Sequence, residues 1–286
     1  MFIVKNKFIF IGLAVLLVIG SLFSINYFGI KKGIDFTGGT VIEVTVATTT
    51  TKEINVTRMG EEGVKVFKTG DYSYKFISSG LYEATKAEIV EELAGVPFTE
   101  TQINTVGPTL GKEMTKKATI AIIVVVLAIL AFIAFAFREV SVPVASWKYG
   151  VAAMVTIVHD IIIPTGVYAY LSHAYGAEVD TLFVVALLTI MAVTISDKIV
   201  VFDRIRENLK AAKGTFEEII GVSLRQTAVR SINTSLTTVL ALVALYVWGP
   251  ETTKFFSLTL MVGLVVGTYS SIFVASPLLT FLKGKK

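Results

Sequence analysis

Long apolar stretches are the sequence feature that most constrains how this chain can fold. Six of them follow one another, and each has about the 20 residues that an α-helix needs to cross the hydrocarbon core of a bilayer. They cover Phe8–Phe28, Ala118–Phe137, Tyr149–Leu171, Thr181–Phe202, Ser231–Val247 and Phe255–Leu282. Only 17% of the 286 residues are charged, whereas a soluble domain has about 25%. The sequence therefore predicts a polytopic α-helical membrane protein with six transmembrane helices.

The first apolar stretch has a second interpretation, as a secretory signal peptide. Such a peptide has an apolar region of about 7–15 residues followed by a cleavage site of small residues. The stretch here is longer and ends in Asn26-Tyr27-Phe28, and aromatic residues of this kind are typical of a membrane interface. We therefore expect an uncleaved first span.

The segment between the first and second spans, residues 29–117, has a different character. It carries frequent charges of both signs, and glycine-rich turns separate short segments. Alternation predicts strands at Val41–Val46, Val64–Lys68, Tyr72–Ile77 and Thr99–Val106, a hairpin turn at Thr69-Gly70-Asp71, a helix at Leu81–Leu93 and a short helix at Lys52–Met59. This order predicts an aqueous α+β domain of the split-βαβ, ferredoxin-like kind.

Lysine and arginine are divided unequally between the two sides of the spans. One side carries Lys5, Lys7, Arg138, Lys148, Arg204, Arg206, Lys210, Lys213, Arg225, Lys283, Lys285 and Lys286. The other short loops carry only Lys254. Because cytoplasmic loops are enriched in these residues, we expect a multi-pass protein of the cytoplasmic membrane, with both termini cytoplasmic and residues 29–117 extracytoplasmic.

Three parts follow from this topology. They are the N-terminal segment with the first span over residues 1–28, the extracytoplasmic domain over 29–117, and the five remaining spans over 118–286. A polar segment near 204–228 separates two of these spans. It holds Phe216, Ile219, Ile220 and Leu224 at helical spacing, which predicts an interfacial helix lying on the cytoplasmic surface of the membrane.

Asp197 is the strongest candidate for a functional residue. A carboxylate within a membrane-spanning helix costs at least about 2.5 kcal/mol on insertion scales, so it is a functional-site hypothesis by default. A structural ion pair, or a carboxylate that reaches the cytoplasmic interface, is the alternative. The expected partner is Arg230, because the topology places both residues towards the cytoplasmic ends of their helices. An acid held against a guanidinium can couple proton uptake to a change in conformation.

Three further groups accompany this candidate. Asp160 lies about ten residues into the third span and hence about 15 Å deep. Its neighbour His159 is either a proton relay or a packed core histidine. Lys198 either neutralises Asp197 or extends its charge to the interface, and we expect the second because a lysine near a helix end can do so.

Small residues mark the sixth span. Gly263 and Gly267 are four residues apart, and Ser270 and Ser271 follow them. This spacing permits close contact between helices, although glycine is also common in membrane helices generally.

Seven motifs along the chain carry a resemblance to a known family. They are GIDFTGGT at 33–40, VGPTLGKE at 106–113, VHD at 158–160, EVD at 178–180, SDKIVVFDRIREN at 196–208, RSINTSLTT at 230–238 and GTYSSIFVASPLL at 267–279. In this order the motifs resemble the SecF side of the SecD/SecF family of protein-export membrane proteins. Motif positions with an expected structural role are Asp35, Gly38, Gly39, Gly107, Pro108, Asp203, Arg204, Gly267, Ser270 and Ser271.

The resemblance implies a fold, partners and an activity. The fold is half of a resistance-nodulation-division type transporter. The implied partners are SecD, the SecYEG channel, YajC and YidC as further candidates, membrane lipid and an unfolded preprotein outside, with no nucleic acid. The activity is ion-motive-force-driven export of preproteins, without catalytic residues, a metal or an organic cofactor. The proton-coupling aspartate and arginine of the family map onto Asp197 and Arg230, and SecD contributes a further aspartate.

The chain departs from the family pattern around this aspartate. The family commonly reads Gly-Tyr-Ser-x-Asn-Asp-Thr, whereas this chain reads AVTISDK over 192–198. Lys198 therefore replaces a threonine, which changes the local charge and hydrogen bonding. We expect H⁺ as the coupling ion and keep Na⁺ as the alternative.

Two other functions compete with translocation. A small-molecule or lipid exporter of the same fold would use a path between the helices, although such pumps usually need two halves and larger outer domains. An intramembrane aspartyl protease would use two carboxylates such as Asp160 and Asp197. Their different sequence contexts, VHDI and ISDK, and the lack of the expected glycines argue against the protease.

Overall fold

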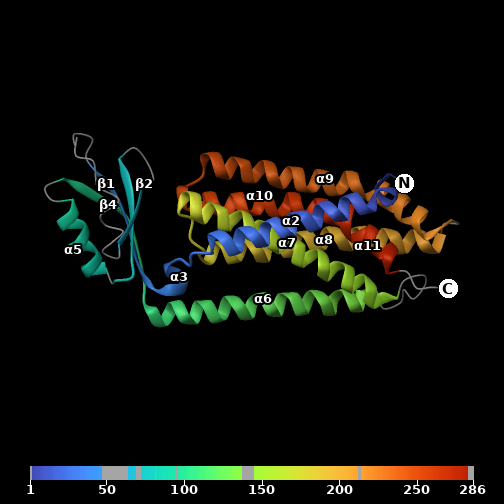
Figure 1. The fold of residues 1–286 in the computed structure, drawn as a ribbon, viewed down its shortest axis with the longest axis horizontal. Helices are drawn as coiled ribbons and strands as arrows, with labels where there is room; N and C mark the ends of the chain where they lie inside the picture. The colour runs from blue at the N-terminus through green and yellow to red at the C-terminus, as the bar shows by residue number, and fades with distance from the viewer. Residues whose placement is uncertain are drawn as a thin grey trace. The chain divides into compact units, whose positions relative to one another are not determined.

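The computed structural model describes residues 2–46, 64–68, 72–80, 82–93, 96–136, 145–211 and 214–282. The chain divides into two compact units. The helical unit comprises Met1–Ile30, Ala121–Ala177 and Leu182–Lys286, and the sheet unit comprises Lys31–Ile120 and Glu178–Thr181. Figure 1 shows the long helices of the first unit and the strands of the second.

The prediction of six membrane spans is confirmed. The structure has six helical segments long and apolar enough to cross a bilayer, within the described residues. The helices are α1 (Phe2–Lys5), α2 (Lys7–Phe28), α6 (Pro108–Ala136), α7 (Ser146–Tyr175), α8 (Thr181–Ala211), α9 (Phe216–Trp248), α10 (Lys254–Ser270) and α11 (Ser276–Phe281), with a 3₁₀ turn, η1, at Glu251–Thr253 and a π turn, η2, at Ser271–Ala275. The sixth span is therefore composite, because η2 joins α10 to α11. Helix α6, which carries the second span, begins at Pro108, ten residues before the predicted span at Ala118, since a proline fits the first turn of a helix.

The interfacial helix predicted near 204–228 is wrong as a separate element. Residues 204–211 are the end of α8, and residues from Phe216 onwards are the start of α9, which continues without interruption to Trp248. The apolar side chains at this start are buried in one cluster with side chains of α8: Phe216, Ile220, Leu224, Val201, Phe202 and Ile205. The apolar face is therefore buried against α8 and other helices of the helical unit rather than against lipid.

The sheet unit has the predicted ferredoxin-like order. Its strands are β1 (Gly39–Val46), β2 (Val64–Lys68), β3 (Ser73–Ser78) and β4 (Phe98–Val106), and its helices are α3 (Ile34–Thr37) and α5 (Tyr82–Glu92). The strands pair antiparallel in the order β2-β3-β1-β4. The predicted helix at Lys52–Met59 and the turn at Thr69-Gly70-Asp71 lie outside the described residues.

Alternation along β1 divides its side chains between the two faces of the sheet. Ile42 and Val44 are buried in one cluster with Ile89 and Leu93, whereas Val41 belongs to a second cluster with other residues. The period of two residues places these sets on opposite faces. α5 therefore covers the face that carries Ile42 and Val44.

Candidate functional site

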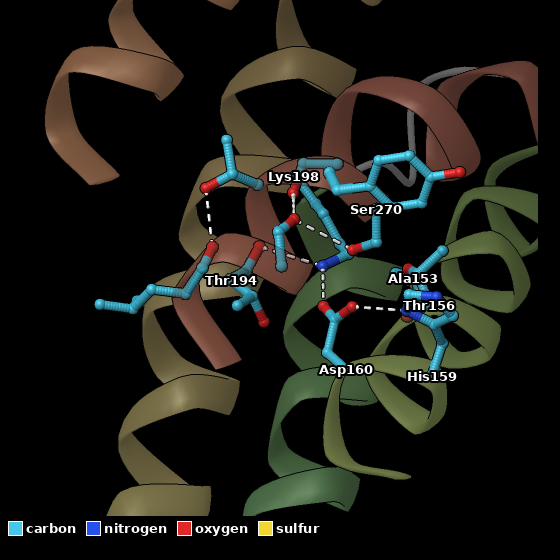
Figure 2. A network of polar contacts seen from close by, with 12 residues as sticks. Ala153, Thr156, His159, Asp160, Thr194, Lys198 and Ser270 are labelled. Atoms are coloured by element: carbon cyan, nitrogen blue, oxygen red, sulfur yellow. Dashed lines mark hydrogen bonds and ion pairs between the residues drawn. The ribbon is translucent and has the colours of Figure 1, made fainter. Parts of the chain in front are cut away.

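A buried ion pair joins α7 and α8. Lys198 Nζ lies 2.5 Å from Asp160 Oδ2 (Figure 2). The exposed fraction of the Lys198 residue is 0% and that of Asp160 is 1%. An isolated charge in this environment would be strongly unfavourable, so each side chain depends on the other.

The expectation that Lys198 extends to the interface is wrong. Its side chain stays inside the bundle, and its Nζ also lies 3.4 Å from the carbonyl oxygen of Thr194, one turn earlier on the same helix. The carboxylate of Asp160 on α7 holds the ammonium in place. The attraction between opposite charges in a low-dielectric interior outweighs the hydration that the ammonium would gain at the interface.

His159 binds the other oxygen of the same carboxylate. Its Nδ1 lies 3.0 Å from Asp160 Oδ1, and the ring is almost fully buried. The ring stacks on Tyr269 with centroids 6.5 Å apart, and the hydroxyl of Tyr269 donates to the carbonyl of Phe10 at 2.7 Å. His159 Nε2 is buried without a hydrogen-bond partner among the described residues. Asp160 thus receives a donor on each oxygen if His159 carries its proton on Nδ1.

Close packing of α10 on α8 closes the site, as the small-residue spacing predicts. A Cβ on Gly267 would lie 2.0 Å from Thr194 Cγ2 and 3.6 Å from Asp160 Oδ2. A Cβ on Gly263 would lie 2.2 Å from Ile190 Cδ1. The serines that follow bond within their own helix, since Ser270 and Ser271 both donate to the carbonyl of Gly267, at 3.0 and 2.8 Å.

Asp197 faces a different neighbour from Lys198. Its Oδ1 accepts a short hydrogen bond from Ser231 of α9, and its Oδ2 is buried without a partner among the described residues. Consecutive residues on a helix point about 100° apart. This angle explains why Asp197 meets α9 while Lys198 meets α7.

The expected pairing of Asp197 with Arg230 is absent from the described part of the chain. Arg230 is exposed, and Asp197 is bonded instead to the next residue, Ser231. The rotation of α9 decides this outcome, because neighbouring positions 230 and 231 point in different directions. The structure therefore brings together Asp160 with Lys198, and Asp197 with Ser231.

The remaining motif residues have structural contacts. Arg204 donates to Gln226 at 2.7 Å and to Glu207 at 2.6 Å, and Asp203 lies 3.8 Å from Arg206. Gly38 and Gly39 have φ of +79° and +131°, which L side chains rarely adopt. Gly107 precedes α6, which begins at Pro108, and Asp35 accepts hydrogen bonds from Thr181.

Sequence reasoning missed the Asp160–Lys198 pair, although a signal for it exists. Asp160 lies 15 residues before Tyr175 at the end of α7, and Lys198 lies 17 residues after Thr181 at the start of α8. A short loop joins the two helices, so similar distances from this loop indicate a similar depth. Within the described ranges, no group of three or more His, Cys, Asp or Glu residues is arranged to hold a metal ion.

Comparison with known proteins places the chain in a family. Residues 85–285 match the family model "Protein export membrane protein SecD/SecF, C-terminal", and residues 28–50 match "SecD/SecF GG Motif". The protein translocase subunit SecF of Thermobaculum terrenum is 38% identical over 99% of this chain and 94% of its own length. The subunit of that name from Anaerolinea thermophila is 35% identical over 96% of this chain and 92% of its own length.

A solved structure gives the same result for the fold. The crystal structure of SecDF, a translocon-associated membrane protein from Thermus thermophilus, matches 97% of this chain with a TM-score of 0.83 and 31% identity. This chain spans 38% of the length of that protein. The two family models, the relatives of similar length and the shared fold show that the chain belongs to the SecD/SecF family of protein-export membrane proteins.

Proposed function

We propose that the chain is a SecF-type subunit of a protein translocase and uses an ion gradient, together with a SecD-type partner, to promote preprotein export. Relatives that bear the name protein translocase subunit SecF align along nearly its whole length, which supports this role. The chain covers 38% of the SecDF protein, so a SecD-type partner would supply the rest. A SecYEG-type channel, YajC, YidC and the emerging preprotein complete the proposed set of partners.

The polar face of α9 supports a membrane partner. Arg230, Asn233, Thr234 and Thr237 are exposed within the span, next to the partly exposed Asp197. Polar groups and charges are unfavourable against lipid. We therefore assign this face to contact with helices of the SecD-type partner, which would also bring an acid towards Arg230.

The observation that carries the mechanism is the unpartnered oxygen of Asp197. One oxygen of this carboxylate is bonded to Ser231, and the other is buried without a partner among the described residues. Binding a proton neutralises such a group, and a sodium ion is the alternative. Movement of one charge through 100 mV makes about 2.3 kcal/mol available. The carboxylate of Asp160 is already neutralised by Lys198 and serves as a fixed contact between α7 and α8.

The proposed topology follows the lysine and arginine distribution. Both termini lie in the cytoplasm and the sheet unit lies outside the cytoplasmic membrane, where preproteins emerge. The chain acts there as a non-enzymatic subunit without an organic cofactor.

Preprotein translocation into membrane vesicles that contain the chain and its SecD-type partner tests this function. We expect Asp197→Asn to abolish the stimulation by an ion gradient while assembly with the partner persists. Glu251→Gln is the matched control, because Glu251 is an exposed acid whose side chain pairs with Lys254. Full stimulation by the Asp197→Asn variant would remove this residue from the mechanism. Separate proton and sodium gradients identify the coupling ion.

A further inference from the structure

The short helix α3 is a junction within the sheet unit. Gly38 connects it directly to β1, whose first residue is Gly39, and both glycines have positive φ. A Cβ on Gly39 would lie 2.3 Å from the carbonyl oxygen of Ser78 on β3. The backbone of this connection is therefore packed against the sheet, with no room for a side chain.

The beginning of α6 holds α3 from a second direction. A Cβ on Gly111 would lie 2.7 Å from the backbone nitrogen of Gly38. The hydroxyl of Thr115 lies within hydrogen-bond distance of two carbonyl oxygens, that of Gly111 one turn earlier at 3.0 Å and that of Phe36 at 3.3 Å. α3 thus lies directly on the first turns of the helix that becomes the second span.

The beginning of α8 is bonded to the same helix through Asp35. Its Oδ2 accepts from the backbone N–H of Thr181 at 2.9 Å and from the hydroxyl of Thr181 at 2.7 Å. The first N–H groups of a helix have no partner within the helix, and a carboxylate there is favoured by the helix dipole. Asp35 therefore caps α8 across 146 positions of sequence.

A pair of backbone hydrogen bonds reinforces this cap. The N–H of Gly33 donates to the carbonyl of Val179 at 2.8 Å, and the N–H of Val179 donates to the carbonyl of Lys31 at 2.8 Å. The segment before α3 and the segment before α8 are thereby paired as one parallel bridge. We call these bonds, together with the Asp35 cap, the α3–α8 tie.

We propose that Asp35 is a positioning residue for translocation, and that the α3–α8 tie stays closed while α8 passes its movement to the sheet unit. This inference rests on the proposed function, in which Asp197 on α8 binds the coupling ion. Asp197 lies 16 residues after Thr181 on one uninterrupted helix, a distance of about 24 Å at 1.5 Å per residue. A shift of this helix along its axis therefore displaces Thr181, Asp35 and, through α3, the first residue of β1.

The first test replaces Asp35 in the full chain assembled with its partner. Asp35→Ala removes the cap, whereas Asp35→Asn keeps an oxygen that can accept from Thr181. We expect amide hydrogen exchange at 181–183 to rise about fivefold or more in Asp35→Ala, with loss of gradient-driven translocation. Asp35→Asn should retain most of both, and the exposed Glu83→Ala is the control. Unchanged exchange or full translocation in Asp35→Ala would overturn the proposal.

The second test fixes the tie covalently. A Cβ on Gly33 would lie 3.5 Å from Cβ of Glu178, which is within the range for a disulfide, and 3.1 Å from the carbonyl oxygen of Val179, which is a tight contact. Gly33 has an ordinary φ of −76°, and the chain has no cysteine. Gly33→Cys with Glu178→Cys should therefore form one defined disulfide, with each single cysteine variant as its control.

The second test distinguishes a tie that stays closed during translocation from a tie that opens. A closed tie predicts that the oxidised double-cysteine protein translocates like the reduced one, and that oxidation restores translocation to Asp35→Ala. An opening tie predicts that oxidation blocks translocation and reduction restores it, which would overturn the proposal. Hydrogen exchange at 181–183 reports the tie without translocation. If no variant or wild-type protein responds to an ion gradient, the proposed function fails while exchange still decides whether Asp35 holds α8.

Discussion

The ammonium of Lys198 lies 2.5 Å from Oδ2 of Asp160, and neither side chain is exposed to any useful extent. The pair therefore behaves as one neutral unit between α7 and α8. Removal of one member of such a pair strongly destabilises the fold, because the remaining buried charge has no partner. Removal of both members destabilises the fold only weakly.

The first prediction compares variants that remove one charge of this pair with a variant that removes both. We expect Asp160→Asn and Lys198→Met each to lower the free energy of unfolding by about 3–5 kcal/mol. The double variant Asp160→Asn/Lys198→Met should recover most of this loss. Denaturant unfolding in detergent measures all three, and additive losses in the double variant would contradict the coupling.

The contact between Gly267 and Thr194 gives the second prediction. We expect Gly267→Ala to destabilise the chain by about 1–3 kcal/mol, because overpacking forces the helices apart. Thr194→Ser removes the nearest atom, Cγ2, but leaves Thr194 Cβ at 2.9 Å. The double variant Gly267→Ala/Thr194→Ser should therefore recover part of the stability that Gly267→Ala loses. Gly12→Ala is the control, since a Cβ there meets nothing within 4 Å. Thermal unfolding of these variants measures their stabilities, and equal losses in Gly267→Ala and Gly12→Ala would contradict the prediction.

The sequence predicts the elements of this fold more securely than the contacts between them. The strand at Val64–Lys68 has the same bounds in the structure, because its alternation and flanking turn are local signals. Partners within the membrane depend instead on how each helix is rotated. Residues 197 and 198 are adjacent, yet one meets α9 and the other α7. A rotation of about 100° would exchange their roles, and no local pattern sets that angle.

The start of α9 shows the same limit in another form. An apolar stripe such as the one that contains Ile220 is expected both for a helix on a lipid surface and for a helix packed on a neighbouring helix. The periodicity is identical in the two cases. The helices around this stripe, α8 among them, decide between the two cases, and their positions come from tertiary packing.

Burial of that stripe is the third prediction. Ile220 is fully buried, whereas Val222 of the same helix is 50% exposed. We expect Ile220→Ala to lower the free energy of unfolding by about 2–5 kcal/mol and Val222→Ala to change it by less than about 0.5 kcal/mol. Denaturant unfolding of the two variants measures this difference. Equal small effects would indicate that the stripe faces lipid or detergent instead of α8.

A polar triangle in the sheet unit gives the fourth prediction, a dependence on pH. Lys86 Nζ lies 2.9 Å from Glu100 Oε1 and donates to the hydroxyl of Tyr82 at 2.9 Å, and this hydroxyl donates to Glu100 Oε2 at 2.9 Å. The hydrogen bond from Lys86, followed by that from Tyr82, lowers the pKa of Glu100 below its ordinary 4.5. The charged form is thus favoured in the folded state.

The direction of the effect follows from linkage. A group whose pKa is lowered on folding contributes stability above its unfolded pKa, and this contribution is lost as pH falls through the folded value. We therefore expect wild type to protect the amides of β4 from hydrogen exchange more than Glu100→Gln does at pH 7. The difference should shrink below the ordinary pKa of 4.5 and disappear once Glu100 is protonated. Comparison at each pH cancels the intrinsic change in exchange rate, and a difference that persists or grows in acid would show that Glu100 does not hold α5 to β4 through its charge.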